Sequence, residues 1–191
     1  AREIAGFAAV ADRWWDASGP FRPLHRLNPV RLAFIRDALT GHFGLSGDEQ
    51  PLAGLEIADI GCGGGLICEP LARMGATVTG IDAAPEALAV ARGHAQGAGL
   101  AIEYLEGTAE AVVAQGRRFD AVMALEIVEH VADRTAFVAD CCRLVKPGGS
   151  IVMSTLNRTP QAFALAIVGA EYLLRWVPRG SHRWRKFVRP A

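Results

Sequence analysis

The sequence predicts an α/β fold: a doubly wound, mainly parallel sheet with helices on both faces. Three observations lead to this prediction. Short apolar runs alternate with helix-compatible segments from residue 55 to residue 155, a pattern typical of parallel strands joined by right-handed crossovers. The first apolar run leads directly into a glycine-rich turn, Gly61 to Gly65, and the second run ends in Asp82. A strand, a glycine turn, a helix, a strand and an acid, in this order, build a small-molecule site at the carboxyl edge of such a sheet.

The elements follow one another in a simple order. The N-terminal part, residues 1–45, is predicted to be helical, with Asn28 as N-cap, Pro29 as the first helical residue and Gly44 as the end of the helix. A turn at Lys146 to Gly149 precedes the last strand. The strands are predicted at 55–60, 77–81, 101–106, 119–125 and 150–155, and the helices between them at 65–74, 85–97, 109–115 and 134–145.

The length and composition are those of one globular domain over residues 1–191. The chain is 51% hydrophobic and 21% charged, which is enough apolar material for a core and too little charge for a disordered segment. The formal net charge is zero, so no global field favours nucleic acid, and we expect no nucleic-acid partner. The four cysteines form no C-x-x-C pair, which makes zinc unfavourable and indicates free thiols of a reducing compartment.

The spacing of the glycines indicates which ligand the turn binds. A dinucleotide fingerprint, G-x-G-x-x-G, would need a glycine where Leu66 stands. A nucleoside without phosphates fits better, and S-adenosylmethionine is the common one. Its sugar hydroxyls would meet Asp82, and its amino-acid tail would lie over Gly61, Gly63 and Gly65. Two alternatives stay open: the turn only connects a strand and a helix, or the protein is a dinucleotide-dependent oxidoreductase.

Two acids and a histidine follow the strand predicted at 119–125. Glu126, Glu129 and His130 are spaced so that one helical turn brings them together. Such a set can hold a divalent cation: the oxygens favour Mg²⁺ or Mn²⁺, and the imidazole leaves Zn²⁺ open. Alternatively, His130 alone serves as a general base near neutral pH. In a third interpretation Glu126 orients the loop and His130 caps a helix, without any metal.

Both ends of the chain carry features of their own. Trp14 and Trp15 either cover the cofactor edge or pack on the sheet. Arg31 can pair with the carboxylate of a cofactor or lie on the helix surface. Residues 160–191 join an apolar stretch to six cations with interleaved aromatics, and no acid follows Glu171. This combination predicts contact with an anionic membrane surface, with a solvated end as the alternative.

Several strings of the sequence point together to one family. They are Arg13 to Asp16, Pro23 to Arg31, Asp59 to Gly65, Gly75 to Asp82, Glu126 to His130, Ser154 to Arg158 and Val168 to Tyr172. Together they resemble the ubiquinone-biosynthesis O-methyltransferase family, which lies within the class I S-adenosylmethionine-dependent methyltransferases. The resemblance covers nearly the whole chain. The glycine turn is shared by the whole class, whereas the tryptophan pair, S-T-L-N-R and V-G-A-E-Y are specific to the family.

The resemblance implies a function and a set of site residues. The function is methylation of a catechol-type hydroxyl of polyprenylated ubiquinone precursors, at two steps of the pathway. Cofactor positions fall on Arg31, Gly61, Asp82 and Leu125, and catalytic and divalent-cation positions fall on Glu126, Glu129 and His130. Mg²⁺ is therefore an expected second cofactor. A non-catalytic component with the same fold, docked on a membrane, is the remaining alternative.

The resemblance also implies a location and reveals two departures. The lipid substrate places the protein in the cytoplasm at the bacterial inner membrane, or on the matrix side of the mitochondrial inner membrane, and implies a complex with other proteins of the pathway. The family usually has Met where this chain has Leu125, an apolar exchange of similar volume. The chain also stops at Ala191, before the last two strands of its relatives, so we expect those strands to be absent from the sheet.

Overall fold

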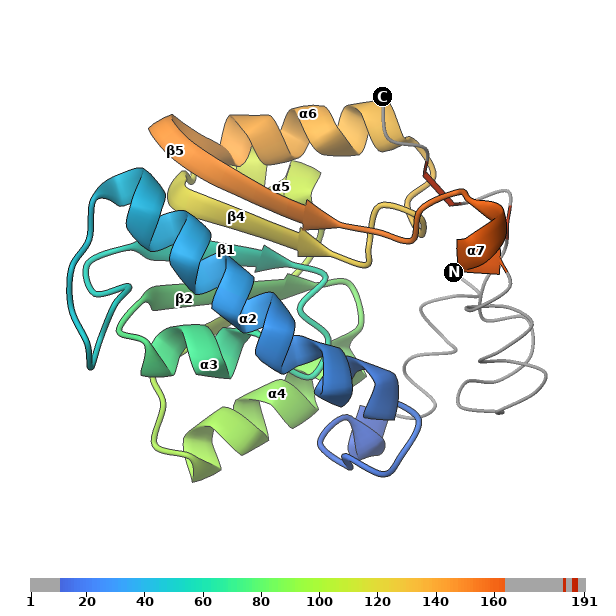
Figure 1. Ribbon diagram of the computed structural model, residues 1–191, viewed down its shortest axis with the longest axis horizontal. Helices are drawn as coiled ribbons and strands as arrows, with labels where there is room; N and C mark the ends of the chain where they lie inside the picture. The colour runs from blue at the N-terminus through green and yellow to red at the C-terminus, as the bar shows by residue number, and fades with distance from the viewer. Residues whose placement is uncertain (1–10, 164–183, 185–186, 189–191) are drawn as a thin grey trace.

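A parallel sheet with helices on both faces forms the structure (Figure 1). The computed structural model describes residues 11–163, 184, 187 and 188. In this part of the chain the sheet has five strands in the order β3-β2-β1-β4-β5, and every neighbouring pair is parallel. The strands are β1 (Glu56–Ile60), β2 (Thr77–Asp82), β3 (Glu103–Glu106), β4 (Phe119–Leu125) and β5 (Val145–Ser154). The predicted fold class is confirmed.

The helices divide between the two faces of the sheet (Figure 1). They are η1 (Ala11–Arg13), α2 (Arg22–Phe43), α3 (Cys68–Arg73), α4 (Pro85–Gly97), α5 (Ala109–Ala114), α6 (Arg134–Leu144) and α7 (Pro160–Ala162). Because successive strand side chains point to opposite faces, Ile57 packs with α2, α3 and α4, whereas Ala58 packs with α5 and α6. Two separate apolar clusters therefore fix the carboxyl ends of β1, β2 and β4 at one edge of the sheet.

The predicted start of the first long helix is wrong. α2 begins at Arg22, with Pro23 in its first turn and Pro29 inside the helix. Asn28 is buried and accepts a hydrogen bond from Arg31, so it does not cap the helix. A proline inside a helix removes a backbone hydrogen bond and crowds the preceding turn, and contacts such as that of His25 with the Trp14 carbonyl offset this cost. The predicted end at Gly44 is confirmed, in a left-handed conformation with φ 64°.

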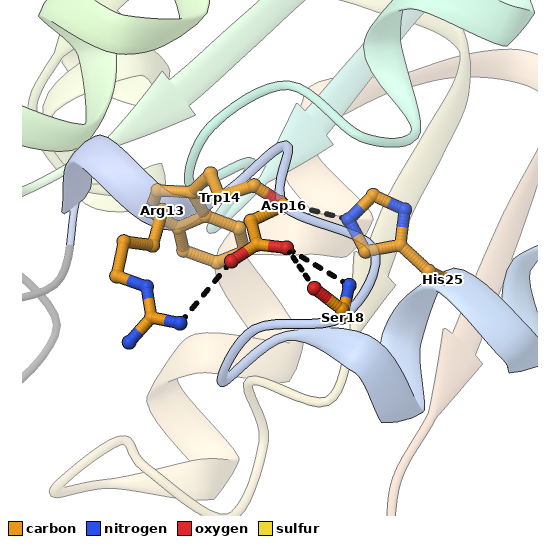
Figure 2. Close-up of polar contacts among 5 residues, drawn as sticks. All are labelled: Arg13, Trp14, Asp16, Ser18 and His25. Atoms are coloured by element: carbon orange, nitrogen blue, oxygen red, sulfur yellow. Dashed lines mark hydrogen bonds and ion pairs between the residues drawn. The ribbon is translucent and has the colours of Figure 1, made fainter.

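The segment before α2 is folded back on itself around one carboxylate (Figure 2). Asp16 accepts hydrogen bonds from the Ser18 backbone and hydroxyl, at 2.9 and 2.6 Å, and from Arg13 at 3.1 Å. These contacts, those of Ser18 first, lower the pKa of Asp16 to about 2. The ring of His25 in the first turn of α2 hydrogen-bonds the carbonyl of Trp14 at 2.8 Å. These contacts fix Trp14 relative to the start of α2.

The last strand also begins earlier than predicted. β5 starts at Val145, so the expected turn at Lys146 to Gly149 lies inside the strand. Residues 146–149 have no partner in the register against β4, which passes from the Phe119–Val145 pair to the Ala121–Ser150 pair, and Gly148 has a φ of 79°. The pairing is regular again from Ser150 onward. This regular part aligns the end of β5 with the end of β4, where the acids begin.

Two further observations concern the sequence predictions. All four cysteines are free thiols, as predicted. Within the described residues, no helix is long and apolar enough to cross a bilayer.

Candidate active site

The glycine turn after β1 is tied to the end of β2. The backbone N–H groups of Gly61 and Cys62 both donate to the carbonyl of Ile81, at 2.7 and 3.1 Å. Gly63 has φ 53°, in the left-handed region that favours glycine. A side chain at Gly63 would also meet the ring of Trp14 at 2.5 Å. The turn therefore needs glycine both for its backbone conformation and for its close neighbour.

Asp82 stands beside this turn, as predicted from the sequence. Its Oδ2 accepts a hydrogen bond from the Gly63 N–H at 2.8 Å, and its Oδ1 accepts one from the Ala84 N–H at 2.8 Å. Each carboxylate oxygen has two lone pairs, so each oxygen can accept one more hydrogen bond. The side chain is half-buried. The geometry suits the neighbouring hydroxyls of a ribose, although that contact stays a prediction.

Both tryptophans of the N-terminal segment pack on the turn. Trp14 lies over Gly63 and Gly64, where an added Cβ would come within 2.5 and 2.4 Å of its ring. It also stacks on Phe21 with ring centroids 3.8 Å apart. Trp15 donates its indole N–H to the Gly64 carbonyl at 3.0 Å. Both tryptophans thus pack on the glycine turn at the predicted cofactor edge, and these contacts are with this turn and not with the strands.

A hydrogen bond between a buried acid and a histidine joins the helices beneath the turn. Glu69 on α3 has a side chain only 3% exposed, and it accepts a hydrogen bond from the His94 ring on α4 at 2.6 Å. The same ring stacks on Trp15 at 3.5 Å with nearly parallel planes. Trp15 therefore joins the N-terminal segment to α4 as well as to the glycine turn.

Glu126 begins the acid segment at the end of β4. Its φ of 55° is unusual for a residue other than glycine. Its Oε1 accepts hydrogen bonds from Arg31 on α2 and from the hydroxyl of Ser154, both at 2.8 Å. Burial raises the pKa of Glu126; the Ser154 hydrogen bond opposes this, and the charge of Glu129 adds to it. Arg31, predicted to meet the cofactor, thus lies at the site and contacts Glu126.

Glu129 is the more deeply buried of the two acids. It is 6% exposed, and its Oε2 accepts a hydrogen bond from the Thr155 hydroxyl at 2.7 Å. Its carboxylate lies close enough to Glu126 to raise the pKa of that residue through a hydrogen bond as well as through charge. The two acids therefore lie close together beyond the carboxyl end of β4.

His130 follows Glu129 in the chain and borders an open hollow of about 630 Å³ lined by residues 130–134. Its backbone N–H donates to the Ile127 carbonyl at 2.8 Å, closing a turn. In the part of the chain that the structure describes, no three His, Cys, Asp or Glu side chains gather closely enough to hold a metal ion. The donor types of Glu126, Glu129 and His130 suit a divalent cation, but their arrangement is not a three-ligand site.

The acid segment and the glycine turn are in direct contact. Ile127, between the two acids, packs against Gly61 so closely that an added Cβ would come within 2.3 Å of its Cδ1. The structure therefore brings together most of the predicted site, with Gly61, Gly63 and Asp82 on one side and Arg31, Leu125, Glu126 and Glu129 on the other, whereas His130 is not gathered with the two acids. Ser154 and Thr155 were missed as contacts of the acids, although two hydroxyls at the end of a strand beside β4 were a usable signal.

A glycine turn after β1, an acid ending β2 and acids after β4 define a class: Rossmann-like methyltransferases that use S-adenosylmethionine. Residues 58–153 match the family model described as "Methyltransferase domain". A ubiquinone biosynthesis O-methyltransferase of Methylobacterium sp. (strain 4-46) is 57% identical over 191 residues, which is 100% of this chain and 77% of the relative. One from Maricaulis maris (strain MCS10) is 54% identical over 99% of this chain and 74% of the relative. The chain belongs to the ubiquinone biosynthesis O-methyltransferase family.

A solved structure agrees on the fold. The DhpI–SAH complex matches with a TM-score of 0.61 and 22% identity, covering 81% of this chain and 68% of that one. At this identity the likeness shows the fold alone. The protein is thus an S-adenosylmethionine-dependent O-methyltransferase, and the comparisons do not favour an oxidoreductase or a non-catalytic component.

Proposed function

We propose that the protein methylates a catechol-type hydroxyl of polyprenylated ubiquinone precursors, at both O-methylation steps of the pathway. The observation that carries this proposal is the contact of Ile127 with Gly61, because it places the acid pair directly beside the turn that would hold the methyl donor. The names of the relatives support ubiquinone biosynthesis as the pathway. Residues 1–191 would act as one methyltransferase domain.

The reaction needs a donor site, an acceptor site and a base. In the donor site Asp82 accepts the sugar hydroxyls, and Gly61 and Gly63 let the backbone approach the amino-acid tail. A phenol has a pKa of about 10, so little of it is ionised at neutral pH. The acid pair orients the attacking hydroxyl by accepting a hydrogen bond from its neighbouring catechol hydroxyl, and His130 at the hollow takes the proton of the attacking hydroxyl. The oxygen attacks the sulfonium methyl in line, the carbon–sulfur bond breaks, and S-adenosylhomocysteine leaves. Good alignment alone can contribute about 7–11 kcal/mol.

A methylation assay tests this function. The protein is incubated with S-adenosylmethionine and a short-chain prenyl catechol, and the methyl ether and S-adenosylhomocysteine are measured together. Equal amounts of both products are expected. Binding of S-adenosylhomocysteine without any methyl ether from catechol acceptors would contradict the proposal and favour a non-catalytic role.

We also propose that Glu126, Glu129 and His130 hold a divalent cation, Mg²⁺ or a similar ion. The support is chemical: two neighbouring carboxylates are what a cation neutralises, and a bound cation would lower the pKa of a coordinated hydroxyl. The described geometry does not gather three ligands, so no step above depends on the ion. Chelation is expected to lower the methylation rate at least tenfold, with recovery on adding Mg²⁺ and measurable heat of Mg²⁺ binding. An undiminished rate in excess chelator would contradict the proposed cation and leave His130 as the base.

The proposed lipid acceptor predicts contact with a membrane through residues 160–191. Most of this segment lies outside the described residues, so the proposal rests on its composition. Six cations near an anionic surface can contribute roughly 1 kcal/mol each. Sedimentation with anionic vesicles is therefore expected, with release at high salt. In the cell the protein would bind peripherally to the cytoplasmic or matrix face of the membrane. Equal sedimentation with neutral vesicles would contradict the electrostatic part of this proposal. A complex with other proteins of the pathway stays a prediction.

A further inference from the structure

We infer that Ser154 and Thr155, at the end of β5, are positioning residues that hold Glu126 and Glu129 at the acceptor side of the reaction. Ser154 donates its hydroxyl to Glu126 Oε1 at 2.8 Å, and Thr155 donates its hydroxyl to Glu129 Oε2 at 2.7 Å. Each of these two consecutive residues thus holds one of the two acids. This inference rests on the proposed function of the same site.

The register of the sheet explains why these two residues reach the acids. Ser154 pairs with Leu125 in the parallel ladder of β4 and β5. The Glu126 N–H then donates to the Ser154 carbonyl at 2.9 Å, so the backbone contact continues one residue past the strand. Ser154 therefore fixes Glu126 through both its carbonyl and its hydroxyl. Thr155 follows where the strand has ended, and its hydroxyl reaches Glu129 one turn further along.

The described hydrogen bonds of the two acids use one oxygen of each carboxylate and leave the other oxygen for the substrate. Arg31 and Ser154 both bond Oε1 of Glu126, and Thr155 bonds Oε2 of Glu129. A glutamate has three side-chain torsions, so a carboxylate that loses its anchor samples several rotamers. A displacement of about 1 Å can cost roughly a hundredfold in rate. We therefore expect the two hydroxyls to raise kcat by restricting the rotamers of the two carboxylates.

Other observations separate positioning from a role in folding. Ser154 and Thr155 are half-buried, and neither belongs to the apolar clusters that hold the sheet. The backbone of Glu126 is in the left-handed region, which persists only where surrounding contacts fix it. The hydroxyl of Ser154 is one of those contacts, whereas the sheet pairing of β5 uses only the backbone. Removing a hydroxyl should therefore disturb the acids and leave the fold intact.

The test compares Thr155→Val, which removes the hydroxyl at nearly constant volume, with Thr155→Ser, which keeps it. We expect Thr155→Val to lower kcat at least tenfold, with the Kd of S-adenosylhomocysteine unchanged within twofold, and Thr155→Ser to retain kcat within threefold. Ser154→Ala should behave like Thr155→Val. Thr40→Val on α2 is the matched control, because it removes a hydroxyl that bonds only the local carbonyl of Asp37; its kcat should equal that of the wild type.

A double variant shows whether Thr155 acts through Glu129. In a Glu129→Gln background, Thr155→Val should cost less than threefold further, because residues in one network are not additive. Two results would overturn the inference while the proposed function stands. One is a full tenfold loss of kcat from Thr155→Val in both backgrounds. The other is a wild-type kcat for both Thr155→Val and Ser154→Ala. A wild-type protein that binds S-adenosylhomocysteine yet methylates no catechol would overturn the proposed function, and the inference with it.

Discussion

Asp82→Ala is expected to weaken the binding of S-adenosylhomocysteine at least a hundredfold. The carboxylate would accept two sugar hydroxyls while it also holds the Gly63 and Ala84 N–H groups. Hydrogen bonds to a charged group contribute about 1.5–3 kcal/mol each, so two of them amount to about 3 kcal/mol or more. Since about 1.4 kcal/mol corresponds to tenfold in Kd, calorimetric titration should resolve the loss easily.

The variant needs controls because Asp82 also shapes the turn. Asp82→Asn keeps one carbonyl oxygen but cannot accept hydrogen bonds at both positions, so an intermediate Kd is expected. Asp48→Ala changes an exposed loop acid and should bind as the wild type does. Circular dichroism should report the same helix content for all three variants. A Kd for Asp82→Ala within threefold of the wild type would mean that the sugar is held elsewhere, and the assignment of the donor site would be wrong.

The fold could be predicted because its signals are local. Alternating apolar runs, the glycine turn and the acid at Asp82 each depend on a few neighbouring residues. The errors arose where distant contacts decided the outcome. The helix starts at Arg22 because contacts such as that between His25 and the Trp14 carbonyl hold the first turn. Similarly, β5 starts at Val145 because that residue pairs with Phe119 of β4, ahead of the register shift at the Lys-Pro-Gly-Gly segment.

The candidate site could be predicted in its members and not in its contacts. The residues that carry charge or lack a side chain stand out in the sequence. Which donor holds which acid depends on the pairing of β4 with β5, where Ser154 stands opposite Leu125. Likewise, the contact of Arg31 with Glu126 joins residues 95 positions apart. Such contacts follow from packing, which no short pattern in the sequence encodes.

Glu129→Gln is expected to lower kcat at least a hundredfold while the Kd of S-adenosylhomocysteine stays within threefold. Glutamine has nearly the same shape, so it can keep the contact with Thr155, but it lacks the negative charge that orients the attacking hydroxyl. Loss of the group that orients the attacking hydroxyl can cost about a hundredfold, as a misplacement of about 1 Å does. Single-turnover methylation measures the chemical step directly, and Glu110→Gln, an exposed acid on α5, is the matched control.

Glu126→Gln separates the acceptor side of the site from the donor side. This variant should also have a lower kcat. Unlike a variant with a general folding defect, it should not bind the cofactor more weakly. Arg31, whose side chain is 9% exposed, would lose its anionic partner at 2.8 Å, and its guanidinium would then favour another carboxylate. If Arg31 meets the amino-acid tail of the cofactor, binding of S-adenosylhomocysteine should hold steady or tighten while kcat falls. A parallel loss of affinity in Glu126→Gln and Glu129→Gln would instead place both acids on the donor side and contradict the proposed division of the site.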